Sequence, residues 1–122
     1  MNPRVIFASL LTIVSMGAYA GYDVHITRKA YWADATNEAI SYAEWVTYVD
    51  CDEEVSPDEL NSRNDFIVVA EEQDFPLWYE PARGELYTKD PSAAAIRKML
   101  EIAKVLKAKV QGDDGEIYSI EE

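Results

Sequence analysis

The fold is decided by residues 90–118, which read DPSAAAIRKMLEIAKVLKAKVQGDDGEIY. Asp90 can cap a helix, and Pro91 suits the first helical position because no backbone donor is needed there. Apolar residues then recur at helical spacing, at Ile96, Met99, Leu100, Ala103 and Leu106. This spacing predicts an amphipathic helix with one face against a core.

The pattern changes after Val110. Gly112, two aspartates and Gly115 have the chemistry of a turn, and Glu116, Ile117 and Tyr118 alternate as a strand does. The stretch therefore predicts a helix followed by a hairpin, with the helix as the element on which the rest packs.

The earlier part of the chain predicts one further helix and several short strands. Residues 22–28 alternate, with Val24 and Ile26 facing one way and His25 the other, as in a half-buried strand. Ser41 and Glu44 have capping-box spacing and open a short helix that ends near Asp50. That helix carries an apolar stripe at Tyr42, Trp45, Val46 and Val49, which we interpret as core.

Residues 50–59 are an acidic loop, with a short helical turn from Ser56 as an option. Residues 66–70 predict a buried strand, and residues 75–79 and 85–88 predict a hairpin around the turn at 81–84. The fold class is therefore α+β: an antiparallel sheet of about five or six short strands packed by two helices. Residues 21–122 form this single domain.

The chain is strongly acidic, with a formal net charge of -12 over 122 residues. Such a charge disfavours nucleic acid and anionic membranes as partners and favours a basic protein or a metal; solubility alone is the simpler explanation. Five of the eleven cations fall in residues 91–109, against Glu101 alone, which predicts one basic helix face on an acidic body.

Residues 1–20 resemble a secretory signal peptide. Arg4 provides the positive start, residues 5–16 the short apolar core, and Ala18 and Ala20 the small residues before a cleavage site. We expect export, to the periplasm, of a chain that begins at Gly21 and has no membrane span. The alternatives are a buried terminal element, or a cytoplasmic protein whose translation starts at Met16.

Catalytic patterns are weak in this sequence. Cys51 and His25 are the only residues of their kinds, and the carboxylates around Cys51 oppose thiolate formation, so we expect an inert thiol and a structural histidine. Asp113 and Asp114 could suggest a carboxylate hydrolase, but adjacent aspartates more simply serve a turn. No Gly-rich phosphate loop is present.

Metal motifs are incomplete. Asp50, Asp52 and Glu54 have the first spacings of an EF-hand loop, but the sixth position is Val55 and the twelfth is Asn61. One histidine and one cysteine are too few for the usual zinc sites. We therefore expect no catalytic residues, no metal and no cofactor.

Several segments together resemble a group of small, acidic bacterial α+β proteins without an assigned activity. They are YDVHITR at 22–28, the Glu44-Trp45 helix, PLWY at 76–79 and, most specifically, VQGDDGEIY at 110–118. Members of the group begin just before the first strand, so the leader is a departure. In size and acidity the group resembles immunity proteins that neutralise bacterial toxins.

Binding is the function that remains: a non-enzymatic, immunity-protein-like chain that neutralises a basic partner such as a toxin. The predicted partner-binding carboxylates are Asp50, Asp52, Glu53, Glu54, Asp58, Glu59, Asp113, Asp114 and Glu116. Affinity would also need aromatic anchors, for which Trp32, Trp78 and Tyr79 are candidates. The alternatives are an exported enzyme that uses carboxylates or a divalent cation, and a small structural protein of the cell envelope.

Overall fold

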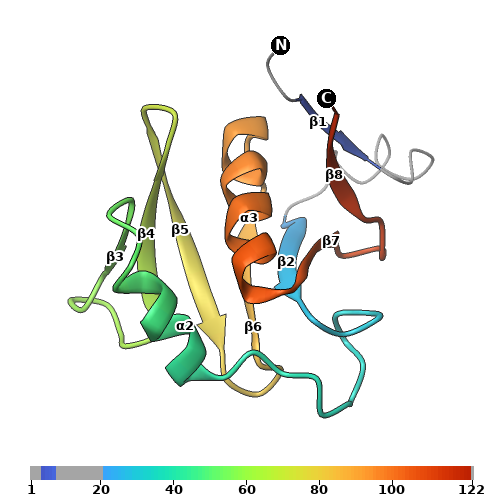
Figure 1. Cartoon of the computed structure of the whole chain (residues 1–122), viewed down its shortest axis with the longest axis horizontal. Helices are drawn as coiled ribbons and strands as arrows, with labels where there is room; N and C mark the ends of the chain where they lie inside the picture. The colour runs from blue at the N-terminus through green and yellow to red at the C-terminus, as the bar shows by residue number, and fades with distance from the viewer. Residues whose placement is uncertain (1–3, 8–20, 122) are drawn as a thin grey trace.

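The computed structural model of the chain describes residues 4–7 and 21–121. Two helices lie among the strands of this part of the chain (Figure 1). The helices are α2 (Tyr42–Val49) and α3 (Ala93–Leu106). The strands are β1 (Arg4–Phe7), β2 (Asp23–Thr27), β3 (Val55–Pro57), β4 (Asp65–Ala70), β5 (Gln73–Glu80), β6 (Glu85–Lys89), β7 (Lys109–Gly112) and β8 (Tyr118–Glu121).

Six strands form the main sheet, in the order β3-β4-β5-β6-β2-β7, and every neighbouring pair is antiparallel. β1 and β8 form a separate two-stranded sheet at one side of the molecule (Figure 1). Both helices lie on the same side of the main sheet. The predicted α+β class, with its antiparallel sheet and two helices, is confirmed.

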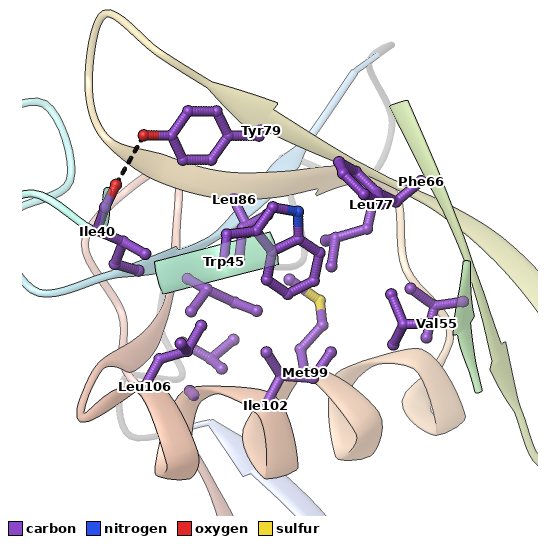
Figure 2. Close-up of a cluster of buried hydrophobic side chains, with 14 of the residues drawn as sticks. Ile40, Trp45, Val55, Phe66, Leu77, Tyr79, Leu86, Met99, Ile102 and Leu106 are labelled. Carbon is purple, nitrogen blue, oxygen red and sulfur yellow. Dashed lines mark hydrogen bonds between the residues drawn. The ribbon is translucent and has the colours of Figure 1, made fainter. Parts of the chain in front are cut away.

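The core fills the space between the helices and the sheet (Figure 2). Trp45 of α2 and Met99 and Ile102 of α3 are fully buried there against Leu77 and Leu86 of the sheet. Tyr79 also points into this layer, and its hydroxyl donates a hydrogen bond of 2.8 Å to the Ile40 carbonyl. Trp45 and Val49 of the apolar stripe predicted for α2 are therefore core, as expected, whereas Tyr42 packs against the core half-buried and Val46 is half-buried outside it.

The start of α2 is confirmed and the start of α3 is corrected. Ser41 and Glu44 form the predicted capping box. The N-cap of α3 is Ser92, whose hydroxyl accepts from the Ala95 backbone N–H at 3.1 Å, and not Asp90. Asp90 has a φ of 49°, and its carboxylate accepts from the Tyr22 backbone N–H at 3.2 Å instead.

Three local expectations differ from the structure. α3 ends at Leu106 because Lys107 adopts a left-handed conformation, so Val110 belongs to strand β7 and not to the helix. The turn at 112–115 is present, but the predicted hairpin is reduced to a single bridge between Gln111 and Ile117. β8 pairs with β1 instead. Ser56 lies in strand β3 and not in a helical turn.

The predicted leader overlaps a described strand. β1 runs antiparallel to β8, with Arg4 opposite Glu121 and Phe7 opposite Tyr118. Residues 8–20, which include the expected cleavage site, lie outside the described residues. Among the helices of the described residues, none is long and apolar enough to cross a membrane.

Candidate functional site

The face of the sheet away from the helices carries a row of aromatic rings. Because Val24 and Ile26 enter the core, His25 between them points to this opposite face. Direct strand pairing places Trp78 beside Tyr87, Tyr87 beside His25, and His25 beside Gln111. Ring centroids are 5.2 Å apart for Trp78 and Tyr87, and 6.4 Å apart for Tyr87 and His25.

Trp32 completes this row from a loop. Residues 28–41, here called the Trp32 loop, connect β2 to α2, and the indole of Trp32 stacks on the His25 ring at 4.1 Å with an angle of 7°. The indole N–H donates to the Asp113 carbonyl at 3.0 Å, and the Trp32 backbone N–H donates to Gln111 Oε1 at 2.7 Å. We call Trp78, Tyr87, His25 and Trp32 the aromatic row; the first two and Trp32 are half-buried.

His25 is buried between two carboxyl groups. Its Nδ1 lies 2.5 Å from Glu85 Oε2, and its Nε2 lies 2.9 Å from Asp113 Oδ1. Each contact needs a proton, so the ring carries both N–H groups or one carboxyl group is protonated. Both ring nitrogens are therefore engaged within the protein, and neither is left to accept a proton from a substrate.

A second buried carboxyl group lies near this cluster. Glu116 is 3% exposed and accepts a hydrogen bond from the hydroxyl of Tyr22. Burial and this bond raise the pKa of Tyr22. A Cβ at Gly112 would come within 2.4 Å of the Glu116 side chain, so the glycine makes room for it. These contacts fix the end of β7 and the turn that carries Asp113.

Carboxylates surround the aromatic row. Asp65 lies opposite Trp78 across the strands, Glu80 lies on β5 and Asp23 on β2, and each is half-buried. Burial, together with the negative charges of Glu80 and Asp23, raises the pKa of Tyr87. The row is therefore flanked by charged groups of both signs, and Asp23 is paired with Lys89 at 3.6 Å. The cations on this face are Arg83, Lys89 and Lys109.

The nine carboxylates predicted to bind a partner are not brought together. Residues 50–59 run from the end of α2 through the edge strand β3 of the main sheet, and residues 113–116 follow β7 at the opposite edge (Figure 1). At the first edge Asp50, Glu53 and Glu59 are exposed, while Asp58 accepts from the Asn61 amide. At the second edge Asp114 is exposed and Glu116 is buried.

Part of the acidic loop is already paired with the last helix. Lys98 is buried on α3, and its Nζ lies 2.5 Å from Glu54, 3.0 Å from Asp52 and 3.3 Å from Glu101. Burial opposes the charge on this ammonium group, but the bonds to Glu54 and Asp52 outweigh burial and raise the pKa of Lys98. The predicted basic helix face is thus partly neutralised within the protein.

Cys51 lies far from the aromatic row. It is exposed after α2, in an open groove of about 610 Å³ whose lining includes Tyr48 and Leu106. Because α2 and His25 lie on opposite faces of the sheet, a Cys51–His25 pair does not form. Within the described residues, no group of three or more His, Cys, Asp or Glu side chains could hold a metal ion.

The three candidate anchors divide between the two faces of the sheet. Trp32 and Trp78 belong to the aromatic row, whereas Tyr79 is 7% exposed and belongs to the core. Sequence reasoning missed Tyr87 and Glu85. Their alternation with Leu86 and Thr88 on β6 was the available signal, since alternate residues of a strand face opposite ways.

Comparison of this chain with protein-family models, with curated proteins and with solved structures gives no match.

Proposed function

We propose that this chain is a non-enzymatic binding protein that neutralises a basic partner protein, as toxin-immunity proteins do. The observation that carries the proposal is the aromatic row on the open face of the sheet, with Asp65, Glu80 and Asp23 around it. Protein interfaces derive most of their affinity from a few central aromatic side chains, and charged residues around them steer the encounter.

The proposed contact surface is thus the open sheet face, and the exposed carboxylates at 50–59 act at longer range. A net charge of -12 attracts a basic partner and repels acidic competitors before contact. Trp78 and Tyr87 then supply apolar area that is already ordered by the sheet, so that little side-chain entropy is lost on binding. The leader pattern supports action outside the cytoplasm, after removal of residues 1–20.

The experiment is a pull-down from the native host, with the chain as bait at low and high salt. We expect a basic protein whose capture falls as salt rises, because exposed charges are screened. The Trp78→Ala bait should lose the partner, with affinity weaker by a factor of about thirty, as for a typical aromatic hot spot. Val105→Ala is the matched control, since Val105 is 65% exposed on α3, on the other side of the sheet.

Two results would refute the proposal. One is a captured protein that is acidic or indifferent to salt. The other is equal capture by Trp78→Ala and Val105→Ala, which would move the contact surface away from the aromatic row.

A further inference from the structure

Arg83 is held differently from the other arginines that meet carboxylates. Arg28 donates two hydrogen bonds to the Glu44 carboxylate, at 2.7 and 3.1 Å. Arg97 donates two to the Glu71 carboxylate, at 2.7 and 3.0 Å. Arg83 Nε lies 3.3 Å from Glu85 Oε2. That N–H forms no hydrogen bond with any part of the chain that the structure describes.

Glu85 is a buried carboxylate with one oxygen that accepts no hydrogen bond from the described residues. It is 0% exposed, and its Oε2 already lies against His25. Its Oε1 is buried and has no hydrogen-bond partner within residues 4–7 and 21–121. A buried acceptor without a donor costs free energy, so a donor placed there would be bound well.

Beside the Glu85 carboxylate, the Trp32 ring offers an aromatic face to a guanidinium group. The Arg83 guanidinium carbon lies 5.3 Å from the centroid of the Trp32 ring, within the range of a cation–π contact. A planar guanidinium can stack on an indole and donate two parallel bonds to one carboxylate, which an ammonium group cannot do. Arg83 makes the cation–π contact but not the paired bonds.

We propose that Glu85 and Trp32 form a binding site for an arginine side chain, which Arg83 fills in the free protein and an arginine of the partner fills in the complex. This inference rests on the proposed function, and it names the group that the aromatic row receives. Arg83 is 35% exposed and lies in the turn between β5 and β6, so it can swing outward without disturbing the core. The incoming arginine would bond to both oxygens of Glu85, whereas Arg83 Nε lies 3.3 Å from Oε2 without a hydrogen bond and Oε1 has no donor in the described part of the chain.

The test uses the full chain with Arg83→Ala, which empties the site. The probe is the peptide acetyl-Gly-Arg-Gly-amide, followed by the NMR shift of the Trp32 indole N–H. We expect the peptide to bind Arg83→Ala at least ten times more tightly than the wild type. The same peptide with citrulline, which keeps the shape and lacks the charge, should not bind.

Arg63→Ala is the matched control. Arg63 also stacks on an aromatic ring, 4.2 Å from the centroid of Tyr42, and should leave peptide binding at the wild-type level when removed. Should Arg83→Ala fold poorly, Arg83→Ser suits a turn position and also leaves the Trp32 ring uncovered, so it serves the same purpose. Equal affinity of the Arg83 and Arg63 variants for the peptide, or equal binding of the citrulline peptide, would overturn the site.

The two proposals can fail separately. If the peptide binds Arg83→Ala as expected but no basic protein is captured from the host, the arginine site stands and the neutralising function falls. If capture of a basic protein depends on Trp78 but the peptide does not bind Arg83→Ala, the neutralising function is supported and the arginine site is refuted.

Discussion

Lys98 shows how one residue fixes the acidic loop to the last helix. Its ammonium group is 7% exposed and meets Asp52, itself 14% exposed, and two more exposed carboxylates. The hydroxyl of Tyr48 adds a further hydrogen bond to Asp52. Burial of these charges is tolerated because every partner is present at once. The loop therefore presents fewer free carboxylates than its composition suggests.

Replacing Lys98 with methionine should destabilise the protein. The new side chain fills the space but leaves Asp52 without its ammonium partner, so the free energy of unfolding should fall by about 2 kcal/mol. Urea unfolding at pH 7 measures the change. Lys104→Met is the control, because Lys104 is exposed on the same helix and its loss should change stability little. Equal effects of the two variants would contradict the importance of the Lys98 contacts.

Glu44 should make stability depend on pH in the acid range. Hydrogen bonds from Arg28 and the Ser41 cap lower the pKa of Glu44 from 4.5 to about 2. Its contribution is therefore present above about pH 4.5, where the unfolded carboxyl ionises, and is lost as the pH falls towards 2. Glu44→Gln can keep the capping box, since glutamine also reaches the cap backbone, but it loses the ion pair.

We expect the melting temperature of Glu44→Gln to lie below that of the wild type at pH 7 and to approach it near pH 2. Melting curves followed by circular dichroism across this range provide the measurement. A difference between the two proteins that stays constant with pH would show that the ion pair with Arg28 does not contribute.

Among the elements, α3 shows how a tertiary contact decides between two good capping residues. Asp90 and Ser92 both suit an N-cap, and the sequence pattern favours Asp90 because proline follows it. In the structure the Tyr22 backbone N–H bonds to the Asp90 carboxylate, and Asp90 takes a positive φ that joins β6 to the helix. Ser92 is then the residue left to cap α3. Local pattern could predict the helix but not this choice.

Ser92→Ala should therefore weaken α3. The variant loses the hydroxyl that accepts from Ala95, at a cost of about 1 kcal/mol in the free energy of unfolding. Ser56→Ala is a suitable control, because Ser56 is an exposed residue of strand β3. Chemical denaturation of both variants decides the matter: if Ser56→Ala costs as much as Ser92→Ala, the hydroxyl of Ser92 is not the cap.

Strand β2 shows which features of the candidate site the sequence could predict and which it could not. The alternation of Val24 and Ile26 predicts correctly which side chains enter the core, since a strand has a period of two. It also predicts that His25 faces the other way, but not that His25 is buried there. That burial comes from Trp32 in a loop, Glu85 on β6 and Asp113 after β7, whose meeting depends on strand order and not on any local pattern.

At the scale of the whole molecule, the two sides of the main sheet have different characters. The helix side holds the core, and the exposed Lys104 and Lys107 lie in the last turn of α3 and at its C-cap. The open side holds the aromatic row and its carboxylates. Composition could predict an acidic molecule with one basic helix, but it located the acidic surface in the loop at 50–59. Strand pairing brings aromatic and acidic residues together on the open sheet instead.

The core also bears on whether the chain can function without its first twenty residues. Among residues 21–120, whose burial is described, the core runs from Val24 to Tyr118, and this set remains after cleavage before Gly21. β1 pairs with β8 alone and not with the main sheet. Its removal would free one edge of the four-residue strand β8 and uncover the part of α3 that β1 contacts, while the six-stranded sheet keeps all its strands.

We therefore expect the chain 21–122 to fold on its own. Losing the backbone bonds between β1 and β8 should lower the free energy of unfolding by about 2 kcal/mol, because each such bond contributes about 1 kcal/mol net and several groups regain water. The chain 1–117 is the instructive comparison. It keeps β1 but lacks Tyr118, which is 5% exposed in the core, and should be the less stable of the two. Urea unfolding with near-ultraviolet circular dichroism compares them. A chain 21–122 without a cooperative transition would make β1 an integral part of the fold, and export with cleavage before Gly21 would then be untenable.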